Sequence, residues 1–378
     1  MQNRTIRSMS PDILMQIENL QTYIFDPGNR GFFRILDGVS FRVPKGKTVA
    51  VVGESGSGKT RLIFSLMGLV DARPGVIGGH IYLQTDGQTV DLLEGLEKVC
   101  EISRQDGRLV VSKDERRWSR EFGYEEIMRG IRGKRIALIM QEAKSALSPY
   151  QDIYTQAREA YLIGHDGVEE GADETVRFLL RELQILDKAF EYPHNLSGGT
   201  CHRAMMVLSF AADPDLLIAD EPTTGLDCPL QVKVLELLYR YRHGDLFPQR
   251  KEKQRSLLLI THQLEIVEKL ADELVVMYGG KVLETGSVEQ ILRGGARHPY
   301  TRKIINIYQN PPALDIGEGV ILPSIPGAVP SPLAANPGCR FLDRCEERMD
   351  ICAHQQPPRV SLDGPPLSNV YCHLHDKQ

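Results

Sequence analysis

The sequence predicts an α/β fold built on a mainly parallel sheet, and two observations support this prediction. Short apolar runs typical of buried strands recur along the chain, at 47–53, 135–140, 215–220, 256–261 and 273–278. Helical stretches separate several of these runs, and in residues 173–186 apolar side chains recur about every 3.6 residues. Alternating strands and helices are typical of a parallel sheet that is covered on both faces.

Composition places the chain among ordinary soluble globular proteins, because 42% of its 378 residues are hydrophobic and 25% are charged. A net charge of -5 provides no broad basic field, so no nucleic-acid partner is expected. The N-terminus has no continuous apolar segment of the signal-peptide type, and the longest apolar run, 204–212, is about half of what a spanning helix needs. We therefore expect a protein of the reducing cytosol.

Five further segments are predicted from their patterns. Residues 13–20 and 36–43 have short strand patterns, and a helix is expected from Lys59 to about Leu69. From His80 to Lys134, strand-like pieces mix with a stretch dense in both charge signs, which we interpret as an exposed insertion. A helical segment follows over about 142–212.

A domain boundary is predicted near residue 310. Seven of the 22 prolines fall between Pro311 and Pro337, and prolines continue neither a helix nor a central strand. The chain therefore divides into a domain over 1–310 and a small C-terminal module over 311–378.

The segment GESGSGKT, residues 53–60, follows a buried strand and precedes a helix, which is the setting of a phosphate-binding loop. Its glycines allow successive backbone N–H groups to curl around a phosphate, and the following helix adds its positive end. Lys59 is expected to reach the β- and γ-phosphates of ATP, and the Thr60 hydroxyl to coordinate Mg²⁺. The predicted nucleotide-binding residues of this loop are Gly53, Glu54, Ser55, Gly56, Ser57, Gly58, Lys59 and Thr60.

A second phosphate-site element is DLLIADEP, in which a hydrophobic strand ends on two carboxylates. Asp220 is placed to hold Mg²⁺. Glu221, next to it, is placed to orient and polarise an attacking water.

The segment NLSGGTCHR, residues 195–203, lies between these two elements. Its Leu196, Ser197, Gly198 and Gly199 resemble the signature motif of ABC ATPases, and Ser197 resembles a helix N-cap. The resemblance implies a P-loop ABC ATPase with a RecA-like core sheet, an N-terminal antiparallel β-region and a helical subdomain. A P-loop kinase or GTPase would not carry this signature.

Further roles follow from the resemblance. It implies that Gln141 contacts Mg²⁺ and nucleotide, that Asp227 belongs to the D-loop, and that His262 is the switch histidine. An aromatic residue stacking on adenine is expected at Tyr23, with Phe25 as the alternative. Four positions depart from the family pattern without removing a phosphate or metal contact, namely His202, Gln263, Glu142 and Ala143.

Residues 297–305 and 324–345 resemble the ATP-binding subunits of dipeptide and oligopeptide importers. This resemblance implies a peripheral protein at the cytoplasmic face of the inner membrane that hydrolyses ATP to power peptide import. It also implies a second ATPase subunit, expected to be a distinct homologue, two transmembrane permease subunits and an extracytoplasmic peptide-binding protein. A soluble ABC ATPase acting on DNA or ribosomes, and an importer of another solute such as nickel, remain alternatives.

Four of the seven cysteines lie in the C-terminal module, at Cys339, Cys345, Cys352 and Cys372. Four loop-borne thiolates suit Zn²⁺ or a [4Fe–4S] cluster, whereas disulfides are rare in a reducing compartment. The importer resemblance favours the cluster. A mixed zinc site using His354, His373 or His375 remains open. The remaining cysteines, Cys100, Cys201 and Cys228, are interpreted as small apolar residues.

Overall fold

The structure is a computed structural model, which describes residues 9–28, 31–70, 73–105, 108–247, 250–310, 325–331, 337–362 and 368–376. Most of the proline-rich stretch that suggested a domain boundary lies outside the described residues, so the boundary at 310 stays a prediction. Among the described residues, none of the helices is both long enough and apolar enough to cross a membrane.

The predicted parallel sheet is present and forms the centre of the molecule. Its strand order is β13-β14-β12-β11-β3-β10-β9-β8, and the five strands from β11 to β8 run parallel. These five are β11 (Glu273–Tyr278), β3 (Thr48–Val52), β10 (Ser256–Ile260), β9 (Leu216–Asp220) and β8 (Ile136–Ile139). The side chains of β3, β9 and β10 are buried along their whole length, as expected for continuous apolar runs between two helical layers.

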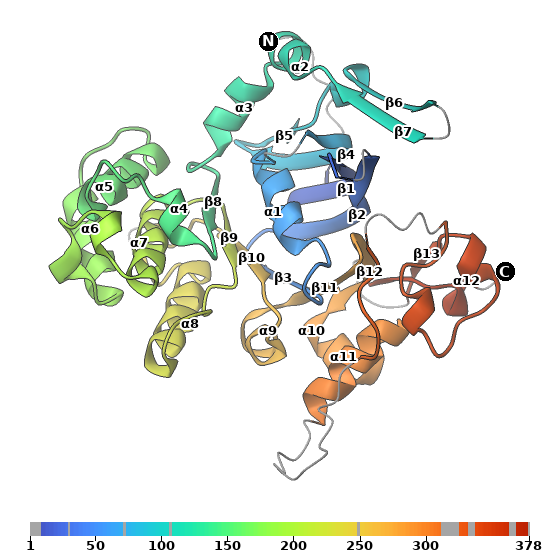
Figure 1. Cartoon of the computed structure of the whole chain (residues 1–378). Helices are drawn as coiled ribbons and strands as arrows, with labels where there is room; N and C mark the ends of the chain where they lie inside the picture. The colour runs from blue at the N-terminus through green and yellow to red at the C-terminus, as the bar shows by residue number, and fades with distance from the viewer. Residues whose placement is uncertain are drawn as a thin grey trace.

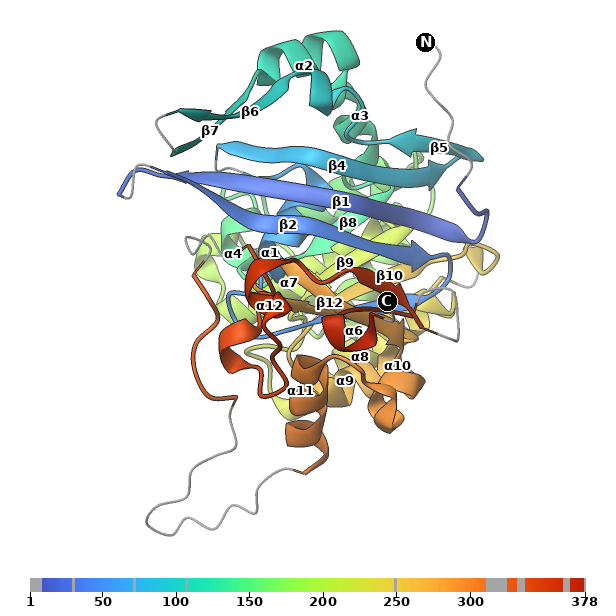
Figure 2. The same cartoon turned by 90° about the vertical axis from the view of Figure 1, so that its right-hand side faces the viewer.

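A second, antiparallel sheet of order β2-β1-β4-β5 lies beside the first, as Figure 2 shows. Its strands are β1 (Ile13–Asp26), β2 (Gly31–Pro44), β4 (Pro74–Thr85) and β5 (Gln88–Asp91). Helix α1 (Lys59–Met67) packs between the two sheets, where its Leu62 and Ile63 share one apolar cluster with Leu36 of β2 and Val51 of β3. Burial of this shared cluster fixes the two sheets relative to each other.

Helices from two parts of the chain surround the core sheet. Those of residues 143–242 lie on the side away from the C-terminus, whereas those of residues 288–309 lie beside the C-terminal segment (Figure 1). Between β8 and β9 the chain forms α4 (Ala143–Ala146), α5 (Ile153–Gly164), α6 (Ala172–Glu182), η2 (Leu186–Lys188), η3 (Pro193–Asn195) and α7 (Gly198–Ala211). After β9 come α8 (Cys228–Arg242), α9 (Leu264–Leu270), α10 (Val288–Gln290), η5 (Ile291–Gly295) and α11 (Pro299–Gln309). Buried residues of α5, α6, α7 and α8 form one core cluster with β8, β9 and β10.

The insertion is narrower than the interpreted segment from His80 to Lys134, because residues 80–91 complete the antiparallel sheet. The additional unit consists of η1 (Leu96–Lys98), a hairpin of β6 (Cys100–Gln105) and β7 (Arg108–Lys113), α2 (Glu115–Phe122) and α3 (Tyr124–Ile131). Strand β7 packs on β2 and β4. Trp118 of α2 is buried and stacks on Tyr124 with ring centroids 3.8 Å apart, and it belongs to the same apolar cluster as α1 and the two sheets, so the unit packs onto the main core.

The C-terminal segment is joined to the core sheet rather than only appended to it. Strand β14 (Asn369–Tyr371) pairs with β12 (Lys281–Ser287), and β13 (Arg359–Ser361) pairs with β14. The remaining elements of the segment are η6 (Leu342–Arg344), α12 (Ile351–His354) and η7 (His373–His375). Figure 1 shows this segment on the side opposite the helical layer.

Candidate active site

The parallel register of the core sheet gathers the predicted catalytic residues at one edge. Val51 of β3 pairs with Ile260 of β10, and Ile260 pairs with Asp220 of β9. Strands in register end together, so the loop after β3, the Asp220–Glu221 pair and His262 meet at their carboxyl ends. Figure 1 shows α1, which follows that loop, above β3.

Two glycines explain the shape of the 53–60 loop. A Cβ on Gly53 would lie 2.2 Å from the carbonyl oxygen of Met277, so any side chain there would displace the neighbouring strand. Gly58 has φ +100 and is the N-cap of α1 without a side-chain hydrogen bond to the helix. The first N–H groups of α1 therefore have no side-chain cap and remain available to an anion.

Lys59 lies across its own loop in this structure. Its ammonium donates to the carbonyl oxygens of Gly53 at 2.6 Å and Glu54 at 3.0 Å. Burial lowers the pKa of Lys59, and the charges of Glu221, Asp220 and Glu54 oppose that shift. The ammonium thus lies within the electrostatic reach of three carboxylates, those of Glu221, Asp220 and Glu54. Its position in the loop allows it to bind a phosphate at this edge of the sheet.

Asp220 and Glu221 are both buried, at 6% and 8% exposed. Burial and the neighbouring Glu221 charge raise the pKa of Asp220 to about 6, and only Lys59 opposes this. In the part of the chain that the structure describes, Lys59 is the one cation that lowers the pKa of Asp220, so the two buried carboxylates lack positive charge and the donor set fits a divalent cation such as Mg²⁺.

Glu221 is held in position from both ends. Its backbone has φ +49, its N–H donates to the carbonyl oxygen of Ile260 at 2.9 Å, and its Oε1 lies 2.8 Å from Nδ1 of His262. The His262 side chain is 64% exposed, so its ring links the buried carboxylate to the open side of the site. This arrangement orients a carboxylate that can accept a proton from water.

The signature motif lies on a different surface from the P-loop. Ser197 caps α7 by accepting a hydrogen bond from the Thr200 N–H at 3.2 Å. Gly198 and Gly199 line a cavity of about 620 Å³ together with Gln141. Figure 1 shows α7 in the helical layer and α1 between the sheets, so one chain does not bring its own signature motif to its own phosphate loop.

The other implied residues have clear local roles. Gln141 is exposed just after β8, and Asp227 caps α8 by accepting from the Leu230 N–H at 3.0 Å. His202 is buried in α7 with burial lowering its pKa, and its Nε2 has no hydrogen-bond partner among the described residues. These contacts leave the roles predicted for Gln141, Asp227 and the signature residues as proposals.

The structure corrects the choice of aromatic residue. Tyr23 is fully buried against Ile77 and Val111, and its hydroxyl accepts a hydrogen bond from Arg34, so its ring offers no free face to an adenine. Phe25 is 44% exposed and tilts against Phe32 with ring centroids 5.1 Å apart. Of the two candidates, only Phe25 is available for stacking.

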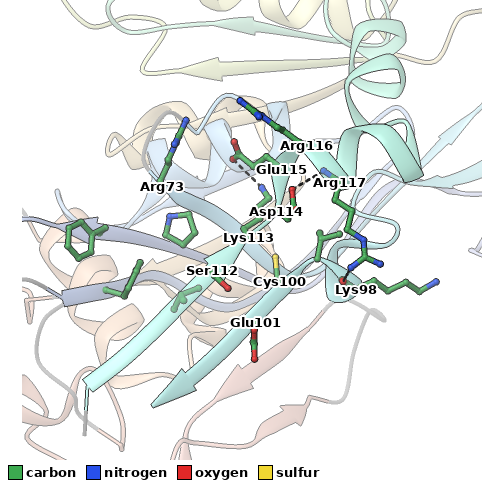
Figure 3. Close-up of a pocket in the computed structure, with 15 residues that line it drawn as sticks. Arg73, Lys98, Cys100, Glu101, Ser112, Lys113, Asp114, Glu115, Arg116 and Arg117 are labelled. Atoms are coloured by element: carbon green, nitrogen blue, oxygen red, sulfur yellow. Dashed lines mark hydrogen bonds and ion pairs between the residues drawn. The ribbon is translucent and has the colours of Figure 1, made fainter. Parts of the chain in front are cut away.

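Phe25 also lines the wall of a groove of about 970 Å³ between the antiparallel sheet and the insertion (Figure 3). The insertion side carries an ion pair between Lys113 and Glu115, 3.8 Å apart, and Asp114 caps α2. Cys100 lies in this groove, and burial raises the pKa of its thiol to about 11, which agrees with its interpretation as an unreactive residue.

The four C-terminal cysteines converge, but they do not form a finished metal centre. All four line one small enclosed cavity, and the Cys339 N–H donates to the Cys352 carbonyl oxygen at 2.8 Å. Burial raises the pKa of Cys339 to about 12 and that of Cys372 to about 11. Among the described residues, no group of three or more His, Cys, Asp or Glu side chains is arranged to hold a metal ion. The metal-binding part of the predicted module is therefore not supported as a preformed site.

Of the other cysteines, Cys201 is buried as expected, whereas Cys228 is exposed at the first position of α8. Its interpretation as a small apolar residue is therefore incorrect.

Sequence reasoning missed two residues that hold the loop from outside. The Glu54 N–H donates to the hydroxyl of Tyr300 at 3.0 Å, and the Glu54 carboxylate accepts from Arg344. Tyr300 and Arg344 lie 246 and 290 residues after Glu54 along the chain, so no local sequence pattern could have revealed these contacts.

A buried strand, a glycine loop, an uncapped helix and a strand ending in two carboxylates define a P-loop ATPase, and the signature segment places it in the ABC class. An ABC transporter family model matches residues 36–224, and a model of the oligopeptide/dipeptide transporter C-terminal region matches residues 283–352. The chain belongs to the ATP-binding subunits of the oligopeptide/dipeptide family of ABC transporters, so the family predicted from the sequence is confirmed.

Two curated relatives illustrate the similarity. The oligopeptide transport ATP-binding protein AppD of Bacillus subtilis (strain 168) is 36% identical over 374 residues, covering 97% of this chain and 98% of AppD. The probable peptide ABC transporter ATP-binding protein y4tR of Sinorhizobium fredii (strain NBRC 101917 / NGR234) is 32% identical, covering 92% of this chain and 91% of y4tR.

Solved structures agree on the fold. The dimeric ATP-binding cassette MJ0796 bound to ADP and phosphate superposes with a TM-score of 0.55 at 17% identity, covering 73% of this chain and 99% of that one. An ATP-binding subunit of an ABC transporter gives a TM-score of 0.52 at 24% identity, covering 74% of this chain and 92% of that one.

Proposed function

We propose that this chain hydrolyses ATP to power the import of peptides through an ABC transporter. The match of residues 283–352 to the C-terminal region of oligopeptide/dipeptide transporters carries the peptide assignment. The names of AppD and y4tR, an oligopeptide and a peptide transport protein, point the same way.

Within the site, the chain's own groups divide the work. Lys59 and the free N–H groups of α1 hold the phosphates, and Phe25 supports the base. Thr60, Asp220 and Gln141 would hold Mg²⁺, which when bound offsets phosphate charge. Glu221 orients the attacking water and accepts its proton, while His262 keeps the Glu221 carboxylate in place.

The signature motif is proposed to act on a second subunit. Because α7, which Ser197 caps, and α1, which follows the P-loop, lie apart in Figure 1, a complete site needs Ser197, Gly198 and Gly199 from a partner ATPase facing the nucleotide of this chain. Asp227, at the start of α8, would lie at the same interface. The partner is expected to be a distinct homologue, and closure around ATP would drive the transport step.

The complete transporter is proposed to include two transmembrane permease subunits and an extracytoplasmic peptide-binding protein. The chain would lie at the cytoplasmic face of the inner membrane. Its exposed Gln141 segment, which lines the 620 Å³ cavity, is a candidate surface for coupling to the permease.

We also propose that Cys339, Cys345, Cys352 and Cys372 take up a [4Fe–4S] cluster, with Zn²⁺ as the alternative. The support is their convergence on one cavity, since four thiols in that setting match the donor set of either centre. Their raised pKa values mean that a bound cation would have to stabilise the thiolates.

The test of the proposed function is reconstitution in proteoliposomes with the permease, partner ATPase and binding protein of the same transporter. ATP-dependent uptake of labelled peptides is expected, and the same vesicles carrying Glu221→Gln should show none. Uptake of Ni²⁺ instead of peptide would show that the transporter imports nickel and not peptides. ATPase activity stimulated by DNA or ribosomes, without transport, would reject the proposal.

A further inference from the structure

A loop of the C-terminal segment reaches the phosphate-binding loop. Nη1 of Arg344 lies 3.1 Å and 3.0 Å from the two carboxylate oxygens of Glu54, the second residue of GESGSGKT. The same nitrogen lies 3.1 Å from the Tyr278 hydroxyl. Arg344 directly precedes Cys345, so the segment between two of the clustered cysteines contacts the nucleotide site.

Arg344 is fixed from several sides. Its side chain is only 4% exposed, its Nε donates to the Pro326 carbonyl oxygen at 2.8 Å, and its Nη2 donates to the Ile325 carbonyl oxygen at 2.6 Å. The guanidinium also lies 5.6 Å from the centre of the Tyr278 ring. A guanidinium held by this many bonds keeps one position and so offers Glu54 a fixed counter-charge.

An aromatic cluster supports the same contact. Phe341, three residues before Arg344, packs on Tyr278 and Tyr300, with ring centroids 5.3 Å away in both cases. Tyr300 accepts a hydrogen bond from the Glu54 N–H, and the Glu54 carbonyl oxygen accepts one from Lys59. Glu54 therefore connects the C-terminal segment, α11 and the phosphate-binding lysine.

Electrostatics give this contact a functional consequence. Glu54 places a carboxylate in the loop that must receive the negative charge of a triphosphate. Left unpaired, this carboxylate would repel the ligand and would compete with it for Lys59, whose pKa already responds to the Glu54 charge. Arg344 supplies the compensating charge from outside the nucleotide domain.

We infer that Arg344 is a positioning residue of the nucleotide site, which neutralises and holds Glu54 so that the loop can accept ATP. The C-terminal segment is thereby a working part of ATP binding and not only a structural appendage. The inference requires ATP binding at this loop, as the proposed function does, but it does not require peptide transport or a metal.

The test compares ATP dissociation constants of the full-length chain and of Arg344→Met, Arg344→Lys, Glu54→Gln and the double variant Glu54→Gln/Arg344→Met. Arg344→Met is expected to weaken ATP binding about tenfold, because one unpaired carboxylate then faces the phosphates. Arg344→Lys keeps the positive charge but loses the planar guanidinium with its several donors. Its ATP dissociation constant should lie between those of the unchanged chain and Arg344→Met. The double variant should bind within about threefold of the unchanged chain, because the repelling charge is gone.

The double variant separates this role from a merely structural one. If Arg344 only held the segment in place, removing the Glu54 charge as well would restore nothing, and the double variant would bind as weakly as Arg344→Met. That result would overturn the inference. In steady-state hydrolysis the change should appear mainly in KM for ATP, with kcat close to that of the unchanged chain.

A matched control uses another ion pair between the same two parts of the chain. Arg302 of α11 lies 2.5 Å from Glu347 of the C-terminal segment, and both are nearly half exposed. Arg302→Met should leave ATP affinity unchanged.

Should every Arg344 variant fail to fold, Glu54→Gln alone tests the inference, because it should bind ATP as well as or better than the unchanged chain. Weaker binding by Glu54→Gln would refute the inference, whereas failure of the unchanged chain to bind ATP would refute the proposed function.

Discussion

Nδ1 of His262 lies 2.8 Å from Oε1 of Glu221, and this pair joins the carboxyl ends of the adjacent strands β10 and β9. A ring N–H that donates to a carboxylate fixes its direction and keeps its second oxygen free. Among the described residues, the hydrogen bond that reaches the other oxygen, Oε2, is a long one of 3.5 Å from the Thr224 hydroxyl. Glu221 is thus oriented but not saturated, which suits a group that must take a proton from water.

Replacing Glu221 by Gln should stop hydrolysis and leave ATP binding intact. The amide keeps the shape but cannot accept the proton, so we expect kcat to fall by a factor of about 10² or more. Phosphate release and ATP binding, measured on the same preparation, check this. Glu101→Gln, on the exposed insertion, serves as the control and should change neither quantity. Unaltered turnover in Glu221→Gln would contradict the assignment.

Replacing Gly53 by Ala should damage the loop through a steric clash. The new Cβ would stand 2.2 Å from the Met277 carbonyl oxygen, and the strand behind it is buried and cannot move aside freely. We expect the free energy of unfolding to fall by about 1–3 kcal/mol and ATP binding to be lost. Thermal unfolding and an ATP titration measure the two effects.

Gly46→Ala is the matched control for this substitution. Gly46 also has a left-handed backbone, with φ +64, but has no atom within 4 Å of a new Cβ. Gly46→Ala should lower the free energy of unfolding by only about 1 kcal/mol and leave ATP binding unchanged. Equal effects from the two alanines would show that backbone conformation, not the close approach at Gly53, decides.

The sequence predicted where the core strands end, and thus where the site lies, because each of these strands has a recognisable pattern. Buried parallel strands read as continuous apolar runs, so the ends of β3 and β9, and the residues that follow them, could be located from the pattern alone. The same reasoning could not locate β13 and β14, since three-residue strands show no periodicity and join the sheet only through pairing with β12.

The choice between Tyr23 and Phe25 failed for a similar reason. Tyr23 and Phe25 are two residues apart with no register shift between them, so alternation along β1 places both on the same face and cannot distinguish them. Tyr23 is buried because Ile77 and Val111 pack on it, and these contacts are distant in the sequence. The contact between Glu54 and Arg344 was also beyond prediction, because it depends on a fold that closes over 290 residues.

The pKa of Asp220 predicts how the stability of the unliganded chain depends on pH. Its folded-state pKa of about 6 lies above the ordinary value of 3.8, so between these values the folded chain binds a proton more tightly than the unfolded one. Stability should therefore fall as pH rises through this range, by up to about 3 kcal/mol. Denaturant unfolding at pH 4, 5, 6 and 7 measures it.

Asp220→Asn isolates this contribution. Glu273 adds a change of the same sign, because burial raises its pKa to about 7, but it is present in both proteins and cancels in their difference. Affinity for Mg·ATP should fall as pH drops below about 6 in the unchanged chain, where Asp220 becomes protonated. A difference in stability between the two proteins that stays flat from pH 4 to 7 would show that Asp220 is not perturbed.

A buried ion pair far from the P-loop should dominate the stability of the core. Arg255 is fully buried, and its Nε and Nη2 lie 2.6 Å and 3.2 Å from the two carboxylate oxygens of Asp213. Arg255→Met leaves that carboxylate short of a partner, so we expect a loss of about 3–5 kcal/mol in the free energy of unfolding, measured in urea. Arg250 also contacts Asp213 at 2.9 Å but is 42% exposed, and Arg250→Met should cost less than about 1 kcal/mol.

The convergence of four cysteines predicts that the chain binds a metal when it is purified without oxygen. A [4Fe–4S] cluster should give about four iron and four sulfide per chain, and zinc should give about one per chain. Cys352→Ser should abolish the bound metal and lower the midpoint of thermal unfolding, because metal binding contributes to folding. Cys100→Ser, in the distant insertion, is the control that should retain it.

Each result of the iron, sulfide and zinc measurement is decisive for the proposed centre. Zinc without iron selects the alternative metal, since the thiols could then serve only as zinc ligands. The absence of iron and zinc from the unchanged chain would mean that the cysteines remain protonated in their apolar cavity. Their thiol pKa values of about 11 to 12, at Cys372 and Cys339, describe that state in the absence of a cation. Packing of the thiols, three of them buried, would then be their whole contribution, and Cys352→Ser would lower the unfolding midpoint equally with and without added iron or zinc.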